Sequence, residues 1–342
     1  MILGWVIMST IYDIAKKTGY SPSTVARALN GRGFCSEKAK QAITAAAEEM
    51  QYSPVQAAKS LKSKITQKVL LCIPDIFNPY YFPMIRGVSD VLEQYGYYTI
   101  LVYSEHNVQK EIQFVKALKE HFADGAIIIS FDFSDKLIEE IRKCPVPIVL
   151  TNQYDSINGT DNFDCVYVDH TKAVYLATMH VLQKGHRNIA FLGGPLKEQT
   201  SLERLEGYRL ALKDQGMPFN DKMIIQSDFS LEGGYQAFEA FMKTKRDVTA
   251  VVACNDLMGV GCLNYCQERG FAVPQDISII TLDNTDYCLC THPRLTSINM
   301  MQNQIGELAA QIVMERIQNG TDYRKIIRLD PLLVERDSVI AL

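Results

Sequence analysis

Polar side chains follow the ends of several apolar runs in the 342-residue sequence. The runs are continuous and rich in β-branched residues, which is typical of parallel strands buried on both faces. Ligands of such sheets collect at the carboxyl ends of the strands, where carboxylates and amides can hydrogen-bond a small molecule. We therefore expect a ligand cleft lined by the polar residues that end these runs: Asp75, Asn152, Asp169, Asn255, Asp256 and Asp283.

A second set of polar side chains lies in "GYSPSTVARALNGRG", residues 19–33. Its spacing predicts a short helix that turns its few apolar residues inward and Ser23, Thr24, Arg27 and Asn30 outward. Arginine can bind guanine or phosphate, and hydroxyl groups can bind either phosphate or bases. The pattern favours DNA binding over the alternative, a helical bundle whose polar face is only solvated.

Signatures of catalysis and of metal binding are missing from the sequence. It contains no G-x-G-x-x-G, P-loop, H-E-x-x-H or G-x-S-x-G motif. "CLCTH" (288–292) matches no common zinc spacing, so half-buried thiols are the better interpretation. Gly193-Gly194-Pro195 weakly resembles a phosphate loop, and a tight turn after a strand explains it about as well. We expect no enzyme activity, no metal and no cofactor.

The outward-facing donors need a rigid support, which residues 9–53 can supply. Thr10, Ser21 and Ser36 stand where N-caps of three successive helices are expected. Gly19 can adopt the left-handed conformation of a tight turn between the first two helices. Three short helices, the first two joined by a glycine turn, predict a helix-turn-helix head, whose second helix normally enters the DNA major groove.

Charge is divided unevenly along the chain. The first 68 residues carry ten lysines and arginines against four acids, a net charge of +6. Because the whole chain has a net charge of −4, the remainder carries −10. A basic head on an acidic body indicates a polyanionic partner for the head, with nucleic acid as the first candidate.

Cellular location is indicated by cysteines and hydropathy. The nine cysteines form no disulfide framework, which fits a reducing cytoplasm. The opening "MILGWVIM" lacks a charged flank and is too short for a signal peptide, and Met8 is a candidate start. No apolar run approaches the roughly 20 residues of a membrane-spanning helix. We expect a cytoplasmic protein without a membrane partner.

Residues 67–342 predict two doubly wound α/β lobes, because two sets of apolar runs alternate with amphipathic segments. We expect an N-lobe of about 67–165 plus about 296–325, and a C-lobe of about 166–295 plus about 326–342. The predicted strands are 68–75, 97–104, 125–130, 146–152 and 165–169 in the first set, and 188–195, 223–228, 249–256 and 276–284 in the second.

The head resembles the DNA-binding head of the lactose-repressor/galactose-repressor family of bacterial transcription regulators. In that family a Tyr-Asp-hydrophobic-Ala start, a glycine turn, a Ser-x-x-Thr-Val helix and an Arg-x-x-Asn end recur in the order seen in "IYDIAKKTGYSPSTVARALNG" (11–31). Pro22 occupies the family's first base-reading position, where it can offer only shape and apolar contact. The resemblance implies DNA contacts by Thr10, Tyr12, Ser21, Pro22, Ser23, Thr24, Arg27, Asn30 and Ser36.

The segment "YSPVQAAKSLKS" (52–63) resembles the family's hinge helix, expected at 54–66. That helix folds when a dimer binds its operator. The resemblance implies that Lys59 contacts DNA and that Leu61 wedges into the minor groove and kinks the duplex. Without the head, Leu61 would be an ordinary apolar linker residue.

The body is similar to the family's effector domain, which has the two-lobed fold of periplasmic sugar-binding proteins. "NPYYFPMIRGV", "RLEGY", "ACNDLMGVG" and "ITLDN" match family segments at the ligand. Aromatic walls beside an arginine, an aspartate and asparagines suit a polyhydroxy ligand, such as a carbohydrate. The implied effector contacts are Tyr80, Tyr81, Asn152, Thr200, Arg204, Phe229, Asn255 and Asp283.

The sequence departs from the family pattern at several ligand positions. Asn152 stands where many members have aspartate, His170 replaces a common asparagine, and Met300 replaces a frequent glutamine. Glu198 stands where a purine-sensing relative would have arginine, which argues against a purine. The family's tetramerising tail is not visible, so a homodimer is expected.

The sequence thus predicts a ligand-responsive transcription regulator, a repressor that binds a near-palindromic operator as a homodimer and responds to a small sugar or sugar derivative. A solute-binding protein of the same fold is the first alternative, but it would need a cleavable signal and no basic head. An α/β enzyme with a helical extension is the second, and it lacks a visible nucleophile–base pair.

Overall fold

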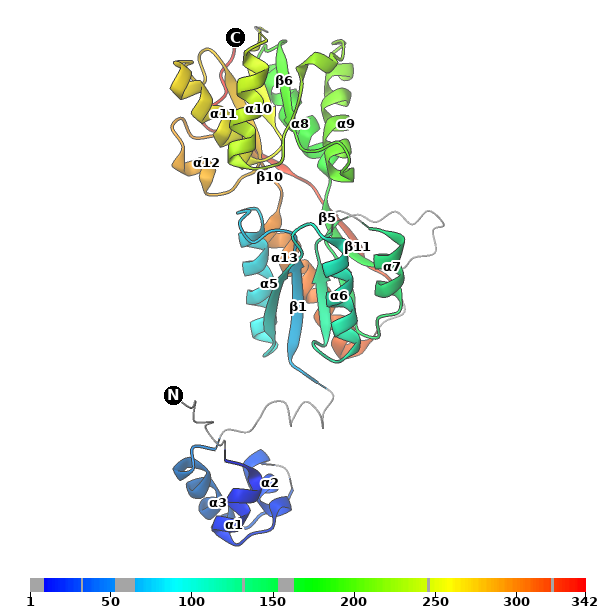
Figure 1. Cartoon of the computed structure of the whole chain (residues 1–342), viewed down its shortest axis with the longest axis vertical. Coiled ribbons are helices and arrows are strands. Elements are labelled where there is room, and N and C mark those ends of the chain that lie inside the picture. The colour runs from blue at the N-terminus through cyan, green and yellow to red at the C-terminus, as the bar shows by residue number, and fades with distance from the viewer. Residues whose placement is uncertain are drawn as a thin grey trace, which may run out of the picture. The chain divides into compact units, whose positions relative to one another are not determined.

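The computed structural model describes residues 9–31, 33–52, 65–130, 133–152, 163–244, 247–320 and 323–342. The chain divides into two compact units, a head that ends at Thr66 and a body that begins at Gln67 (Figure 1). Lys59 and Leu61 lie outside the described residues, so the hinge helix over 54–66 stays a prediction.

The head consists of three helices, α1 (Ile11–Thr18), α2 (Pro22–Asn30) and α3 (Glu37–Glu49). The N-caps predicted at Thr10, Ser21 and Ser36 are confirmed, since each side chain accepts a hydrogen bond from a backbone N–H of its helix. Gly19 has a φ of 75°, the left-handed conformation expected between α1 and α2. The small core of the head consists of Ile14, Ala15, Val25, Ala28, Ala39, Ile43, Ala46 and Ala47.

The N-lobe of the body is a six-stranded parallel sheet in the order β11-β5-β4-β3-β1-β2. Helix α5 packs against α13 on one face, and α6 packs against α7 on the other (Figure 1). The strands are β1 (Lys68–Ile73), β2 (Tyr98–Tyr103), β3 (Gly125–Ile128), β4 (Ile148–Leu150), β5 (Asp164–Val168) and β11 (Ile326–Leu329). The helices are α5 (Tyr81–Gln94), α6 (Val108–Lys119), α7 (Asp135–Arg142) and α13 (Gln302–Asn319).

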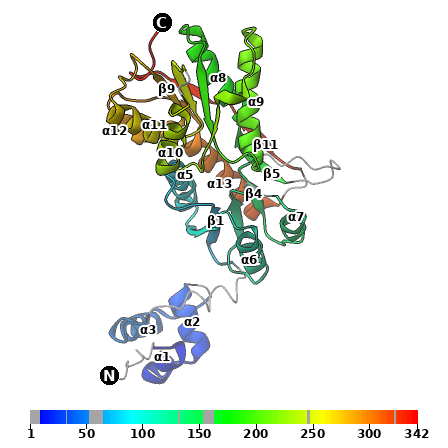
Figure 2. The same cartoon turned by 45° about the horizontal axis from the view of Figure 1, so that its top comes forward.

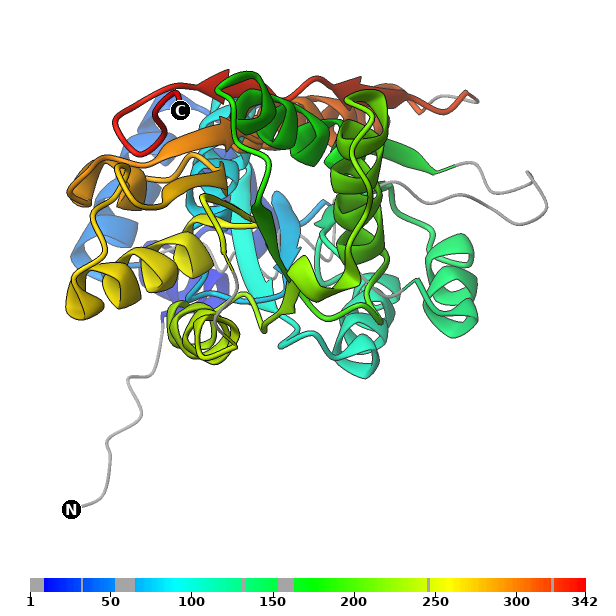
Figure 3. The same cartoon turned by 90° about the horizontal axis from the view of Figure 1, so that it is seen from above.

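The C-lobe repeats this architecture with the strand order β12-β10-β9-β8-β6-β7, in which only the β10–β12 pairing is antiparallel among the described residues. Helices α8 and α9 lie side by side (Figure 2), and α10 and α11 form a second pair on the opposite side of the sheet (Figure 3). The strands are β6 (Ile189–Gly193), β7 (Ile224–Gln226), β8 (Ala250–Ala253), β9 (Ser278–Asp283), β10 (Thr296–Asn299) and β12 (Leu332–Val334). The helices are α8 (His170–Gln183), α9 (Gln199–Asp214), α10 (Leu231–Met242), α11 (Asp256–Arg269) and α12 (Tyr287–Cys290), with a 3-10 turn at Asp221–Met223.

The lobe boundaries differ by a few residues from those expected. Strand β5 pairs with β4 in the N-lobe sheet, so the first crossing follows Val168 and not residue 165. Strand β10 pairs with β9 in the C-lobe sheet, and β11 pairs with β5 in the N-lobe sheet. The chain therefore crosses from the C-lobe to the N-lobe after Asn299, and back to the C-lobe after Leu329. Each of these short strands belongs to the sheet of the lobe that the chain then leaves.

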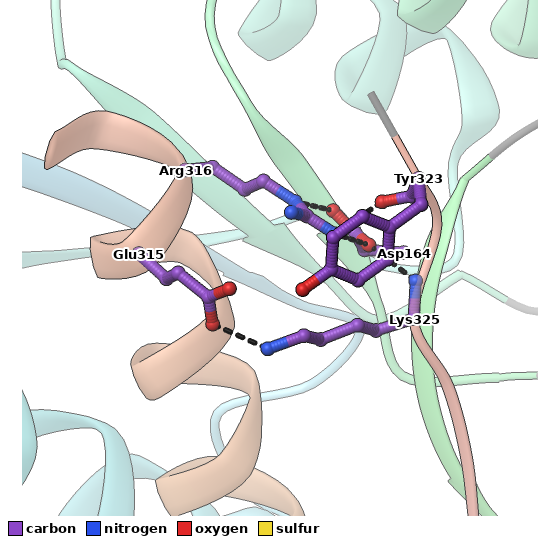
Figure 4. Close-up of polar contacts among 5 residues, drawn as sticks. All are labelled: Asp164, Glu315, Arg316, Tyr323 and Lys325. Carbon is purple, nitrogen blue, oxygen red and sulfur yellow. Dashed lines mark hydrogen bonds and ion pairs between the residues drawn. The ribbon is translucent and has the colours of Figure 1, made fainter. Parts of the chain in front are cut away.

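An ion-pair network ties the last helix of the N-lobe to two of its strands (Figure 4). The Nε and Nη2 atoms of Arg316 each donate to the Asp164 carboxylate at 2.7 Å, and Nη2 also donates to the Tyr323 carbonyl at 2.7 Å. The backbone N–H of Lys325 donates to Asp164 at 2.8 Å, and its ammonium pairs with Glu315. Asp164 therefore joins the start of β5, the end of α13 and the start of β11.

Asp164→Ala is expected to destabilise the body by about 3–5 kcal/mol, because it leaves a buried guanidinium without its partner. The side chains of Arg316 and Asp164 are only 7% and 11% exposed. Asp330→Ala is the control, since it breaks the solvent-exposed 2.7 Å pair with Lys172 and should cost about 1 kcal/mol or less. Equal losses in thermal and urea unfolding of the two variants would contradict a stabilising role for the network.

Candidate DNA interface and effector site

Helix α2 presents an exposed polar face, as the sequence predicted. Pro22, Ser23, Arg27 and Asn30 are exposed, and Thr24 is half-buried. Arg27 lies along its own helix, with Nε 3.3 Å from the Ser23 carbonyl and Nη2 3.4 Å from Thr24 Oγ1. Within the described head no acidic side chain pairs with Arg27, so its charge is available to a phosphate or a base.

Three of the predicted DNA contacts are also helix caps. Thr10 Oγ1 accepts from the Asp13 N–H and donates to the Asp13 carboxylate at 2.7 Å. Ser21 Oγ accepts from the Thr24 N–H at 3.2 Å, and Ser36 caps α3 in the same way. These hydroxyls hold the helices in place and remain on the surface of the head, as does the ring of Tyr12.

An exposed aromatic ring that the sequence reasoning did not select lies close to α2. Phe34 is 89% exposed, in the segment that joins α2 to α3. An apolar side chain in a glycine-rich turn gives no periodic signal, and its exposure becomes visible only once the three helices are packed.

The predicted effector residues of the two lobes meet in the body. Tyr80 and Tyr81 lie at the start of α5 in the N-lobe, with ring centroids 5.1 Å apart. Burial and the nearby carboxyl of Asp283 in the C-lobe raise the pKa of both hydroxyls, while Arg204 opposes this shift. The structure thus brings four of the predicted residues within electrostatic range of one another.

Arg204 and Phe229 form one wall of this site. The guanidinium carbon of Arg204 lies 5.3 Å from the centre of the Phe229 ring, a cation–π geometry. The ring lies directly over Gly194, where an added Cβ would come within 2.0 Å of it. At Gly193 an added Cβ would come within 2.4 Å of the Phe191 ring, so close packing of two aromatic rings explains both glycines without a phosphate loop.

Asn255 and Asp283 stand at the carboxyl ends of adjacent strands. Asn255 caps α11 through the Met258 N–H at 2.9 Å and donates to the Phe229 carbonyl at 2.8 Å. Asp283 is 3% exposed, and its Oδ1 has no hydrogen-bond partner among the described residues. Burial and the neighbouring Asp256 carboxylate raise the pKa of Asp283 well above its ordinary value, although Arg204 opposes the shift.

Asp256 supports the site instead of lining it, contrary to the sequence-based expectation. Its carboxylate is buried and accepts from the hydroxyls of Thr281 and Ser297 and from both the N–H and the hydroxyl of Thr285. These bonds hold the turn in which Asp283 has a φ of 109° and Asn284 a φ of 56°. Backbone strain of this kind persists only where the surroundings fix it, and it is common at ligand sites.

A cavity of about 260 Å³ lies where α8 and α9 begin, and Tyr80, Tyr81, Arg204, Phe229, Asn255 and Asp283 are not among the residues that line it. Asn152 and Thr200, both predicted effector contacts, line it together with Asp169 and His170. The Asn152 amide donates to the Ser130 carbonyl at 2.6 Å. The cavity is lined by Ser130, Phe133, Asn152, Tyr167, Val168, Asp169, His170, Thr171, Gln199, Thr200, Glu203 and Arg328.

Gln302 links the site to the segment where the chain crosses between the lobes, and the sequence reasoning gave it no role. It begins α13 of the N-lobe and is buried, and its Nε2 donates to the backbone carbonyl of Asp283 at 2.6 Å. Met301 before it has a φ of 56° and donates its N–H to Asn299. This hydrogen bond joins the start of α13 in the N-lobe to the backbone of Asp283 in the C-lobe.

Comparison with known families agrees with this geometry. Residues 10–55 match the family of bacterial regulatory proteins called the lacI family. Residues 66–332 match the family described as periplasmic binding proteins and sugar binding domain of the LacI family. The chain belongs to the LacI family.

LacI-family relatives resemble the chain over almost its whole length. Catabolite control protein A of Priestia megaterium is 32% identical over 330 residues, which cover 96% of this chain and 98% of the relative. The HTH-type transcriptional repressor PurR of Photorhabdus laumondii is 32% identical over 336 residues and 97% of each chain. These relatives are transcriptional regulators, so the chain is a transcriptional regulator of this family and not an enzyme.

Solved LacI-family structures share the fold. The transcriptional regulator CelR in complex with cellobiose has a TM-score of 0.74 and 26% identity, over 96% of this chain and 99% of that one. The lac repressor dimer bound to operator and the anti-inducer ONPF has a TM-score of 0.85 over 98% and 100% of the two chains, at 23% identity. The expected two-lobed architecture with a helix-turn-helix head is confirmed.

The remaining expectations concern metals and membranes. In "CLCTH", Cys288 is buried beside Thr281 while Cys290 is exposed, and the described residues hold no group of three potential metal ligands. No helix in the described part of the chain is both long and apolar enough to cross a bilayer.

Proposed function

We propose that the protein is a cytoplasmic repressor that binds a near-palindromic operator as a homodimer and is controlled by a small polyhydroxy effector, a sugar or sugar derivative. The observation that carries the proposal is the convergence of two tyrosines of the N-lobe with Arg204 and Asp283 of the C-lobe. A ligand that touches both pairs would bind one arrangement of the lobes better than another, as allosteric control requires.

The chemistry of the site favours a hydroxylated ligand. Aromatic rings at Tyr80, Tyr81 and Phe229 can cover C–H surfaces, while an arginine, a carboxyl group and an amide can bind hydroxyls. Asp283 Oδ1, buried without a partner, is suited to hydrogen-bond a ligand hydroxyl. The sugar complex of the related CelR supports the same class of ligand for this chain.

On the DNA, we expect Arg27, Ser23 and Asn30 of α2 to read the major groove, while Thr10, Tyr12, Ser21, Thr24 and Ser36 contact the backbone or bases nearby. Pro22 would restrict the base at its position by shape. Lys59 and Leu61 would act in the minor groove between half-sites.

A footprint of the protein on the DNA upstream of its own gene tests this function. We expect protection of a near-palindrome, with a midpoint that shifts when the effector is added. Effectors can be found by thermal shift over sugars and sugar derivatives, because a ligand at 100 times its Kd adds about 2.7 kcal/mol of stability. The absence of a protected palindrome at low salt would refute the proposal that the protein is a repressor that binds such an operator.

The edge strand of the N-lobe is the proposed dimer surface. Strand β2 ends the sheet, and Tyr98, Leu101 and Tyr103 on it are exposed large apolar residues, with Tyr98 64% exposed. An exposed edge strand with such side chains is suited to association. A second copy of the chain on this edge would pair the two heads for the two half-sites.

Tyr98→Glu combined with Leu101→Glu is expected to convert the dimer to a monomer in sedimentation experiments and to weaken operator binding more than tenfold, since a monomer engages one half-site only. Leu332→Glu is the matched control, because Leu332 is 54% exposed on β12 of the other lobe. A dimer that survives the double substitution would place the interface elsewhere.

A further inference from the structure

The most exposed large apolar side chain among the described residues belongs to the head. Phe34 is 89% exposed and stands between α2 and α3, outside the core cluster of the three helices. A phenylalanine ring left in water forgoes the free energy that its burial would release. Single exposed apolar residues are common on protein surfaces, so the surroundings of Phe34 must decide whether it binds a partner.

The backbone on both sides of Phe34 is held in place. Gly33 has a φ of 87°, a left-handed conformation that glycine adopts without strain. Cys35 packs against the core of the head, and Ser36 caps α3 by accepting from the Ala39 N–H at 3.3 Å. The ring of Phe34 is therefore presented to the surroundings from a defined position on the head.

Arg27 places Phe34 on the side of the head that carries the predicted DNA contacts. A Cβ added at Gly33 would lie 3.2 Å from Cδ and 3.6 Å from Cγ of Arg27. The aliphatic stem of Arg27 therefore packs on the backbone directly before Phe34, while its guanidinium stays beside Ser23 and Thr24 of α2. A duplex that Arg27 reaches from α2 would lie close to the ring of Phe34 as well.

The surroundings of the ring suit DNA better than an apolar protein partner. Residues 22–40 carry four basic side chains against one acid, Glu37, which attracts a polyanion. An apolar protein groove would require a larger apolar patch, and in the described part of residues 9–52 Tyr12 is the one other exposed large apolar side chain. DNA offers both a charged backbone and an apolar feature, because the C5-methyl group of thymine lies in the major groove.

We propose that Phe34 is a base-reading residue, whose ring packs on the C5-methyl group of a thymine in the major groove beside the contact of Arg27. This inference rests on the operator binding proposed above and assigns to the head a further residue that determines specificity. Because Phe34 has no polar group on its side chain, it recognises the base by its methyl group and not by hydrogen bonds.

Uracil in place of thymine tests this contact, because the exchange removes only the C5-methyl group and keeps the hydrogen bonds of the base pair. The operator is first located by footprinting the wild-type, full-length protein, and each thymine of a half-site is then replaced by deoxyuridine in turn. We expect a thymine in each half-site at which the wild type loses affinity about fourfold, the factor that corresponds to burial of one methyl group.

Phe34→Ala is expected to bind the unmodified operator about tenfold less tightly and to be insensitive to uracil at that thymine. At every other thymine the variant should lose as much affinity as the wild type. Phe34→Leu should keep part of the uracil effect, because leucine also supplies apolar contact. A structural defect in the head would weaken binding to all these operators alike and would not remove the effect of one methyl group.

Two further variants serve as controls. Phe77→Ala makes the same change at a side chain of the body that is 83% exposed, and it should leave operator binding unchanged. Pro22→Ala changes the other apolar residue expected at the bases, and it should keep the uracil effect that Phe34→Ala removes.

Wild-type affinity in Phe34→Ala, or an equal uracil effect in Phe34→Ala and the wild type at every thymine, would overturn the contact while leaving the proposed repressor intact. A loss in Phe34→Ala without any position at which the uracil effect disappears would overturn it too. If the wild type protects no operator, the proposed function fails, and the contact of Phe34 with a base fails with it.

Discussion

Arg27→Ala is expected to abolish detectable operator binding while leaving effector affinity unchanged. Arg27 is exposed on α2, and its guanidinium is held only by weak bonds of 3.3 and 3.4 Å to its own helix, so DNA can draw it away at little cost. One good arginine–base contact contributes about 1–3 kcal/mol. The proposed dimer has two copies of Arg27, so the free energy lost on substitution would be twice that of one contact. This corresponds to a loss of roughly thirty-fold to more than ten-thousand-fold in operator affinity.

The measurement is fluorescence anisotropy with labelled operator at one fixed salt concentration, since such affinities depend steeply on salt. Lys40→Ala is the matched control, because it removes one exposed positive charge from α3 and not from α2. We expect a small and sequence-independent loss for the control. If both variants lose the same operator affinity, Arg27 acts only through its charge. If Arg27→Ala keeps the affinity of the wild type, Arg27 does not contact the operator.

The head could be predicted closely because its signals are local. A cap, a left-handed glycine and a serine–proline start each act within a few residues, so Thr10, Gly19 and Ser21 fixed the helix ends before any packing was known. The prediction missed Phe34, because exposure of an apolar side chain in a turn depends on how three helices pack and not on the neighbouring sequence.

The body shows where such reasoning weakens. Continuous apolar runs located β1 to β9, and β8 and β9 are buried at every residue, whereas β2 is partly exposed although it was expected to be buried. The short strands β10, β11 and β12 were not predicted, although β10 is largely buried. The lobe to which a short strand belongs depends instead on its pairing partner. Strand β10 pairs with β9 and so belongs to the C-lobe sheet. The hydrophobic pattern alone cannot show whether β10 stands before or after the point where the chain crosses to the N-lobe.

The effector site was predicted only in part, because the contacts of its side chains, like the pairing of a short strand, depend on residues far away in the sequence. A polar residue after a strand is placed at the correct edge of the sheet, but its orientation depends on distant partners. Asn255 and Asp256 are adjacent, yet the Asp256 carboxylate is turned into a network with Thr281, Thr285 and Ser297. Gln302 escaped notice because its role arises from a contact between α13 and the end of β9, two elements that are separate in the sequence.

Asp283→Ala is expected to give a repressor that stays on its operator whatever effector is added. The carboxyl group lies next to Arg204 and the two tyrosines, and its Oδ1 has no partner within the described residues. Loss of its contact with the effector should cost about 1.4 kcal/mol or more, a tenfold or larger rise in effector Kd. Titration of the operator complex with effector, followed by anisotropy, measures both binding and release.

Asp283→Asn separates the hydrogen bond from the charge. Burial raises the pKa of Asp283 well above its ordinary value of 3.8, so the folded protein keeps a proton there up to a higher pH than the unfolded chain does. An asparagine has the same shape and keeps one acceptor, so we expect it to retain much of the effector response that alanine loses. A normal response in Asp283→Ala would show that Asp283 does not contact the effector.

The same protonation makes a prediction about stability. Between pH 3.8 and the folded-state pKa of Asp283, the folded state binds more protons than the unfolded state, so the stability of the wild type falls as the pH rises through this range. Asp283→Asn removes that dependence, and its thermal midpoint should exceed that of the wild type by more at pH 8 than at pH 5. If the two thermal midpoints differ by the same amount at pH 5 and pH 8, Asp283 is ionised in the folded protein. The cost of burying that carboxylate would then have to be offset by the charge of Arg204.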